Sequence, residues 1–143
     1  MPAAASVEEE NSYFEEDAYQ RSFLTLVNAQ RAKYGLTALE MGNDALTAAA
    51  RTRAEEIAVV NSHVRPDGSK CFTVLKDYGV TDTPTGENAA WGSVSPKEVV
   101  NAWMNSEGHR ANILNPEARK MSVGYYYNST STWGHQWIQI FTK

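Results

Sequence analysis

The last third of the chain places apolar side chains on both faces of a predicted sheet, and this restricts the fold more than any other feature. Residues 121–127 carry an apolar or aromatic side chain at every second position, which is typical of a β-strand. Residues 133–141 form a second run, in which Trp137 and its neighbour Ile138 point to opposite faces. A strand that is apolar on both faces has to be buried on both. The polar residues 128–132 between the two runs predict a hairpin loop.

The first two thirds of the chain show helical spacing instead. Helices are predicted at residues 12–34, 43–60, 72–78 and 95–105. Three of the predicted starts carry a side chain that accepts a hydrogen bond from a free amide of the first turn, namely Ser12, Asn43 and Ser95. Glycines at positions that suit a left-handed stop follow two of the helices, namely Gly35 and Gly79.

The predicted helix at residues 43–60 has one face of small apolar side chains. Its members are Leu46, Ala49, Ala50, Ala54 and Ile57. Because alanine side chains are short, this face implies a close approach to a neighbouring layer. The charged side chains of the same helix are predicted to face solvent, and they are Arg51, Arg53, Glu55 and Glu56.

Helices that come first and an antiparallel hairpin that comes last predict an α+β fold. We expect a three-layer α-β-α sandwich with a small antiparallel sheet. The 143 residues match the usual size of one domain, which is predicted at residues 12–143. Residues 1–11 are small or acidic and are predicted to form a flexible acidic tail. Residues 79–86 are predicted as turns, so that Glu87 lies in a loop.

Charge and composition exclude some classes of partner. The net charge at neutral pH is -4 and the sequence pI is about 5.4, whereas non-specific nucleic-acid binding needs a dense cationic surface. No apolar stretch reaches the roughly 18 residues that span a bilayer, so no transmembrane segment is predicted. The start of the sequence lacks the pattern of a signal peptide. The single cysteine, Cys71, forms no internal disulfide and is interpreted as a small, partly buried apolar residue.

Three short clusters contain the titratable side chains best suited to chemistry. They are residues 62–68 with His63, residues 86–88 with Glu87, and residues 103–114 with His109. The two histidines lie too far apart in the sequence for a short metal-binding motif. From the residues alone, each histidine is either a ligand or a hydrogen-bonded structural residue, and Glu87 is either functional or a carboxylate held by loop amides.

Taken in order, several segments resemble the CAP superfamily of cysteine-rich secretory, antigen-5 and pathogenesis-related proteins. The resemblance is closest to its bacterial branch, the SCP-like extracellular proteins, and it extends over residues 20–143. The Gly-Glu-Asn segment at residues 86–88 is weakly specific when taken alone, whereas all five segments in order are highly specific. The segments are residues 26–31, 62–68, 86–88, 103–114 and 137–141.

The resemblance implies a cleft that contains two histidines and one or two acidic residues. His63 matches the first family histidine, Glu87 matches the glutamate of a Gly-Glu-Asn motif, and His109 matches the second histidine. In several members the histidine pair binds a divalent metal, often zinc, so the resemblance implies His63 and His109 as metal ligands. A carboxylate on the other ring nitrogen would orient an imidazole, and Glu87 suits that role. The metal is not expected to be required for the fold.

The chain departs from the eukaryotic members of the family after Trp103. Those members carry a second glutamate three residues after this tryptophan, where the present chain has Ser106 followed by Glu107. One step along a helix rotates a side chain by about 100°. Glu107 therefore either lines the cleft, through unwinding of the helix end, or faces solvent.

Arg110, Asn88 and His135 are the other polar residues near these segments. Arg110 either binds a carboxylate in the cleft or holds the loop ahead of Ile113. Asn88 is predicted to stabilise its loop. His135 shares a strand face with Trp137, which favours packing in the core or in the cleft wall over the alternative of metal ligation.

Three functions remain open at this point. The first is a secreted binding module whose cleft holds a divalent ion and whose adjacent groove takes a lipid, a peptide or a cell-envelope component. The second is a metal-dependent hydrolase, a peptidase or esterase, with Glu87 as general base. The third is a partner-binding module without metal. Catalytic zinc usually has three protein ligands and only two imidazoles are assigned here, so we prefer the first. The resemblance also implies an extracellular location.

Overall fold

Helices dominate the first part of the chain, and two paired strands close it. The structure is a computed structural model that describes residues 7–93, 95–128 and 134–143, with side chains from residue 17 onward. The elements are α1 (Val7–Lys33), β1 (Glu40–Met41), α2 (Asp44–Val59), α3 (Thr73–Asp77), β2 (Pro84–Trp91), α4 (Pro96–Met104), α5 (Glu107–Ile113), β3 (Lys120–Tyr127) and β4 (His135–Thr142).

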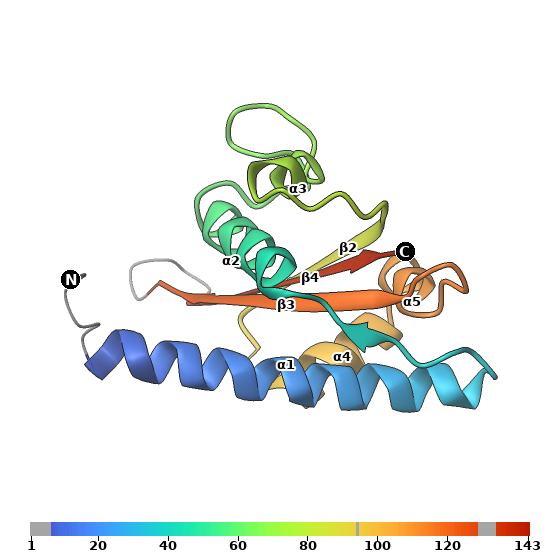
Figure 1. The fold of residues 1–143 in the computed structure, drawn as a ribbon. Helices are drawn as coiled ribbons and strands as arrows, with labels where there is room; N and C mark the ends of the chain where they lie inside the picture. Colours follow the sequence, from blue (N-terminus) through green and yellow to red (C-terminus); the bar gives the residue numbers. More distant parts are fainter. Residues whose placement is uncertain (1–6, 94, 129–133) are drawn as a thin grey trace.

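Within these residues, one sheet separates two layers of helices (Figure 1). The strand order is β1-β3-β4-β2, so β2 lies at an edge. Strand β4 pairs antiparallel with both β2 and β3, whereas the short β1 pairs in parallel with β3. Helices α1 and α4 lie on one side of the sheet and α2 and α3 on the other. The predicted three-layer α-β-α sandwich is confirmed, and its sheet is mixed because of β1.

Each side of the sheet has its own apolar core. Helices α1, α4 and α5 pack on one face, with Phe23, Trp103 and Trp137 among the buried side chains. Helix α2 packs on the other face, where its predicted inner residues meet Ile138 and Ile140. Strand β4 is thus buried on both faces, as its sequence predicts.

Most helix ends agree with their sequence signals. The side chain of Asn43 accepts a hydrogen bond of 3.0 Å from the amide of Leu46 at the start of α2. Ser95 accepts one of 3.3 Å from the amide of Glu98 at the start of α4. Gly35 follows α1 with a φ of 69°, in the left-handed region that favours glycine.

The start of α1 and the region of β2 differ from the sequence-based expectation. Helix α1 begins at Val7, so residues 7–11 are helical and Ser12 lies inside the helix rather than at its cap. Residues 1–6 of the predicted tail lie outside the described residues, as do residues 129–133 of the predicted hairpin loop and the strand that follows it. Strand β2 begins at Pro84, within the segment predicted as turns.

The composition of β2 explains why turns were expected there. Pro84 and Gly86 are typical of turns, and proline is tolerated in a sheet mainly at edges and bulges. In this structure the strand is an edge strand, and its pairing with β4 is irregular between these two residues. The position in the sheet therefore outweighs the local preference for a turn.

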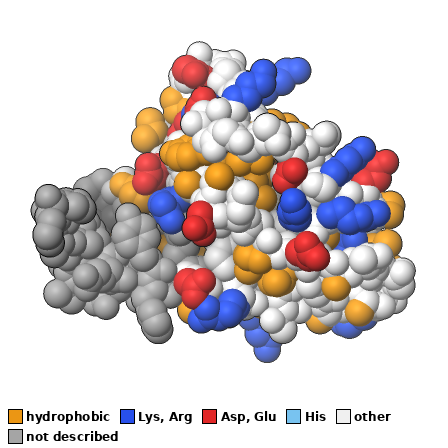
Figure 2. All heavy atoms as spheres, in the orientation of Figure 1, with side chains coloured by type: hydrophobic (Ala, Val, Ile, Leu, Met, Phe, Trp, Pro, Cys, Tyr) orange, Lys and Arg blue, Asp and Glu red, His pale blue; other side chains and the backbone are white. Residues whose placement is uncertain are grey.

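Charged side chains of both signs are mixed on the surface. Figure 2 shows acidic and basic side chains interspersed with apolar ones on the face that it presents. Among the described ion pairs, Lys120 contacts Asp82 at 3.1 Å. In the part of the chain that the structure describes, no helix is both long and apolar enough to cross a membrane.

Candidate functional site

The site is built around the edge strand β2, which carries Glu87 and Asn88. Successive side chains of a strand point to opposite faces of the sheet. Ala89 packs in the core under α2, so Glu87, two residues earlier, faces α2 as well. Asn88 faces the other layer, where its amide contacts Gln139 and the backbone of His109 on α5. Glu87 and Asn88 therefore contact elements on opposite faces of the sheet.

Glu87 is a buried carboxylate held by a buried arginine. The side chain of Glu87 is 2% exposed and that of Arg53 is 0% exposed. Nε of Arg53 donates to Oε2 at 2.9 Å and Nη2 donates to Oε1 at 3.0 Å, which makes a bidentate pair. Such a pair fixes the plane of the carboxylate as well as its charge.

The same carboxylate holds the ring of His63. Oε1 of Glu87 lies 2.9 Å from Nδ1 of His63, whose side chain is 60% exposed. An ionised carboxylate only accepts hydrogen bonds, so Nδ1 is the donor. In the neutral ring the lone pair then lies on Nε2, which is the nitrogen left to face a ligand.

These contacts shift the pKa values of both groups. The hydrogen bond to Glu87 raises the pKa of His63 above its ordinary value, although burial and the charge of Arg53 oppose the shift. Burial would raise the pKa of Glu87, but the hydrogen bonds and positive charges of His63 and Arg53 outweigh it and lower the pKa. Glu87 is therefore ionised at neutral pH.

His109 lies on the other side of β2, near the start of α5. Its Nδ1 is 2.9 Å from the hydroxyl of Ser106, the N-cap residue of α5. Its backbone carbonyl accepts a hydrogen bond of 3.2 Å from the Asn88 side chain. Burial lowers the pKa of His109, and the positive charge of His63 lowers it further.

Side chains of the α4–α5 segment cover the outer edge of β2. Asn112 donates to the carbonyl of Glu87 at 3.2 Å and to the side-chain oxygen of Asn88 at 2.9 Å. Nε1 of Trp103 donates to the carbonyl of Ala89 at 2.9 Å. These bonds satisfy edge carbonyls that would otherwise need water, and they hold α5 and His109 against the strand.

The structure brings together five of the residues singled out from the sequence. His63, Glu87, Asn88, Ser106 and His109 are joined around β2 by the contacts above. Asn88 belongs to a strand rather than to a loop, and its side chain holds His109 by a hydrogen bond to the backbone carbonyl of His109. The two remaining cleft candidates, Glu107 and Arg110, are exposed on α5.

The prediction that Arg53 and Glu56 face solvent is wrong. Arg53 is fully buried against Glu87, and Glu56 accepts a hydrogen bond of 2.9 Å from Nη1 of Arg53. Helical spacing contains a signal for this, because Leu46, Arg53 and Ile57 recur at the intervals of one helix face. A charged residue in an apolar stripe of this kind indicates a buried partner, and no local pattern identifies that partner as Glu87.

The remaining histidine and the cysteine have structural surroundings. Nδ1 of His135 lies 2.6 Å from the hydroxyl of Tyr125, and the two rings stack, as expected for a packing role. Cys71 is buried, and burial raises the pKa of its thiol to about 11. A thiol with so high a pKa is protonated at neutral pH and is a poor nucleophile.

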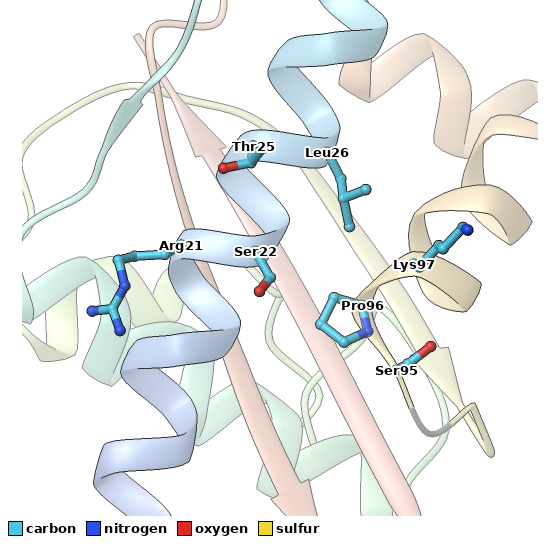
Figure 3. A pocket seen from close by; sticks show the side chains of 7 residues that line it. All are labelled: Arg21, Ser22, Thr25, Leu26, Ser95, Pro96 and Lys97. Atoms are coloured by element: carbon cyan, nitrogen blue, oxygen red, sulfur yellow. The ribbon is translucent and has the colours of Figure 1, made fainter.

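A separate pocket of about 450 Å³ lies between α1 and the start of α4 (Figure 3). In the close-up, Leu26 from α1 and Pro96 from α4 border the gap between the helices, whereas Arg21 extends away from α4. The residues that line this pocket differ from those of the site around β2.

Two bacterial proteins are similar to this chain in sequence. The uncharacterized protein YkwD of Bacillus subtilis is 41% identical over 123 residues, which cover 85% of this chain and 47% of YkwD. The uncharacterized membrane protein YlbC of the same organism is 34% identical over 108 residues, which cover 73% of this chain and 31% of YlbC. The chain thus spans less than half the length of each relative.

Solved structures share the fold at lower identity. An extracellular protein of Bacillus anthracis that contains an SCP domain is 22% identical, with a TM-score of 0.79, and the match covers 99% of this chain and 45% of that one. An outer surface protein of Borrelia burgdorferi is 23% identical, with a TM-score of 0.69 and coverage of 100% and 98%.

A family model gives the assignment that the structures leave at the level of fold. The model of the cysteine-rich secretory protein family matches residues 24–141, which is most of the chain and includes all of the residues around β2. The resemblance seen in the sequence is therefore confirmed, and the chain belongs to the cysteine-rich secretory protein (CAP) family.

Proposed function

We propose that the chain is a secreted binding module whose cleft holds a divalent cation, zinc in the first instance, between His63 and His109. The observation that carries the proposal is that both imidazole rings are oriented by a hydrogen bond at Nδ1. Each imidazole has its Nδ1 engaged by a side chain of the same site, Glu87 for His63 and Ser106 for His109. Metal-binding histidines are commonly oriented in this way, with the other ring nitrogen left for the metal.

The donor set fits a weakly held ion. Imidazole nitrogens are good ligands for zinc. Among the described residues, there is no group of three or more histidine, cysteine, aspartate or glutamate side chains that could hold a metal. Two protein ligands leave the other coordination positions to water or to a bound molecule, which suits an exchangeable ion better than a structural one.

The geometry disfavours the hydrolase alternative, in which Glu87 acts as general base. Both carboxylate oxygens are occupied by Arg53, and one is also occupied by His63. The side chain is nearly inaccessible, and its pKa is lowered, which weakens it as a proton acceptor. Glu87 is better placed to orient His63 than to take a proton from water.

The ligand we propose is a lipid, a peptide or a cell-envelope component that lies beside the cleft. A groove of about 560 Å³ runs between α3 and the segment that leads into β2, with Phe72, Leu75 and Val80 in its lining. Lys70 also lines this groove, and its backbone pairs with Val64, next to His63. An extracellular location accords with the extracellular and outer-surface proteins that share the fold.

Zinc binding is expected to depend steeply on pH. The metal competes with protons for the neutral imidazoles, and the raised pKa of His63 brings that competition closer to neutral pH. Isothermal titration should show an affinity about tenfold or more weaker at about pH 5.5 than at about pH 7.5. His63→Ala should remove the binding at the higher pH.

A third histidine provides the matched control for this experiment. His135 is hydrogen-bonded to Tyr125, and its ring packs against Tyr125 and Tyr127. His135→Ala should leave the zinc affinity unchanged. Equal affinity of the wild type, His63→Ala and His135→Ala at both pH values would rule out the proposed metal site.

A further inference from the structure

The loop that carries His63 also carries Arg65, whose side chain makes several contacts at once. Residues 63–71 form a small hairpin in which the amide of Cys71 donates to the carbonyl of His63 at 3.1 Å. Val64 pairs with Lys70 in the same hairpin. In an extended segment, residues two apart point to the same side. His63 and Arg65 therefore lie on the same side of the hairpin, where Nδ1 of His63 meets Glu87 and the guanidinium group of Arg65 meets Glu56.

Arg65 contacts α3 with one end of its guanidinium group and α2 with the other. Nη1 of Arg65 donates to Asp77 at 2.8 Å and to Thr73 at 3.1 Å, both on α3. Nε and Nη2 donate to the two oxygens of Glu56 on α2, at 3.0 Å and 2.9 Å to Oε2 and at 3.1 Å to Oε1. The side chains of Arg65 and Glu56 are 11% and 17% exposed, so solvent screens the pair that they form weakly.

Glu56 connects Arg65 to the buried pair of Arg53 and Glu87, which contacts His63. Its Oε1 accepts from Arg65 and also from Nη1 of Arg53, which in turn binds Glu87. Nη2 of Arg53 donates to the carbonyl of Ser62 at 2.9 Å, immediately before His63. Charges of alternating sign therefore follow one another without a gap from Arg65 to the carboxylate that holds His63.

We propose that Arg65 is a positioning residue for His63, acting through Glu56 and Arg53 on the orientation of the Glu87 carboxylate. This inference rests on the proposed function only where it concerns metal affinity. It assigns a role in the site to a residue that does not touch either histidine ring.

The physical reason lies in how the carboxylate of Glu87 is oriented. A bidentate pair transmits the position of Arg53 to Glu87, and Arg53 is placed by Glu56 and Ser62. Without Arg65, Arg53 is the one remaining partner of Glu56 among the described residues, and the His63 hairpin loses its side-chain connection to α2. Its side-chain contact with α3 is then left to Ser69, whose hydroxyl lies 3.0 Å from that of Thr73. The hydrogen bond from Nδ1 of His63 to Glu87 should then be made only part of the time.

The tautomer of His63 reports this hydrogen bond directly and needs no metal. At a pH above the pKa of His63, two-dimensional NMR of the ring nitrogens in the metal-free protein should show the Nδ1–H form in the wild type. In Arg65→Ala we expect a mixture of both tautomers, because the Nδ1 donor is no longer held. An Arg65→Ala protein that is folded and keeps the wild-type tautomer overturns the proposal.

Two milder variants keep the test decisive if Arg65→Ala does not fold. Asp77→Asn removes the charge from one partner of Arg65, at a position whose side chain is 54% exposed, and Glu56→Gln removes the charge that joins the two arginines. Each should shift the tautomer in the same direction, less so for Asp77→Asn. An unchanged tautomer in both variants also overturns the proposal.

Arg21→Ala is the matched control for removal of an arginine from an ion pair. Arg21 is paired with Asp17 on α1, and its side chain is 64% exposed. The His63 tautomer should be the same in this variant as in the wild type. A shift of equal size in Arg21→Ala and Arg65→Ala would show a general effect of charge and would overturn the assignment to Arg65.

Zinc titration of the same variants separates the two proposals. Loss of a residue that orients a metal ligand typically weakens affinity by about 10-fold to 100-fold, and we expect about 10-fold for Arg65→Ala. Arg65→Lys keeps the charge without the bidentate contact, and its zinc affinity should lie between those of the wild type and Arg65→Ala. If the wild type binds no zinc while Arg65→Ala still shifts the tautomer, the proposed function fails and the positioning role stands.

Discussion

Arg53→Met is expected to lower the free energy of unfolding by about 3–5 kcal/mol at neutral pH, because it leaves a buried charge without its partner. The Glu87 side chain is 2% exposed and depends on Arg53 for two of its hydrogen bonds. Methionine fills much of the same space, so the loss reflects charge more than a cavity. Urea-induced unfolding monitored by tryptophan fluorescence measures the effect.

The deficit of this variant should shrink as the pH falls. In the wild type the pKa of Glu87 lies below the ordinary value of a glutamate, so its contribution to stability is present above that ordinary value and is lost as the pH falls through the folded pKa. In Arg53→Met the isolated carboxylate has a raised pKa, because burial then dominates. The variant therefore gains stability relative to the wild type as Glu87 becomes protonated.

A double variant distinguishes the ion pair from other effects of replacing Arg53. In Arg53→Met with Glu87→Gln the uncompensated charge is gone, so the double variant should be less destabilised than the sum of the single variants. Arg21→Met, at an exposed arginine of α1, should change stability by less than about 0.5 kcal/mol. Strict additivity of the two buried substitutions would contradict the account of Glu87 as a charge held by Arg53.

The apolar pattern predicts the layers of this fold because burial depends on periodicity. Strand β4 is apolar at both alternating sets of positions, and in the structure it is covered on both faces. The apolar residues on the inner face of α2 are likewise predicted, whereas Arg53 on the same face is not. Caps at Asn43 and Ser95 are local contacts between neighbouring residues, so they too can be read from the sequence.

Features that depend on distant partners are the ones that the pattern misses. Strand β2 contains Pro84 and Gly86, and only its edge position and its pairing with β4 make it a strand. Strand β1 has two residues, and only its parallel pairing with β3 makes it a strand. The turn-forming residues of β2 and the short length of β1 therefore keep the local sequence from distinguishing either element from a turn.

The residues of the site also differ in whether they can be predicted from the sequence. The resemblance to a family assigns His63, Glu87 and His109, because whole segments match in order. Arg53 and Glu56 lie on a helix whose charged residues suggest solvent exposure, and their partners are supplied by β2 and by the His63 loop. A buried charge needs a partner that is close in space, and sequence spacing on one helix carries no information about a strand elsewhere in the chain.

The second large effect is expected at Gly124 on β3, where α2 comes closest to the sheet. Gly124→Ala should lower the free energy of unfolding by about 3 kcal/mol, as overpacking of a rigid contact does. A methyl group at this position would lie 2.2 Å from backbone atoms of Ala50 and 2.3 Å from the backbone nitrogen of Arg51. Backbone atoms cannot turn aside as a flexible side chain does, so α2 has to move away from β3.

Gly108→Ala is the matched substitution at a glycine with free space around it. Gly108 lies in α5, is exposed, and has nothing within 4 Å of the position that a methyl group would take. Alanine favours the helix over glycine by up to about 1 kcal/mol, so this variant should be neutral or more stable. Movement of α2 in Gly124→Ala should also disturb Arg53, and with it the Nδ1–H tautomer of His63. A Gly124→Ala protein as stable as the wild type would show that α2 does not contact β3 as closely as this structure requires.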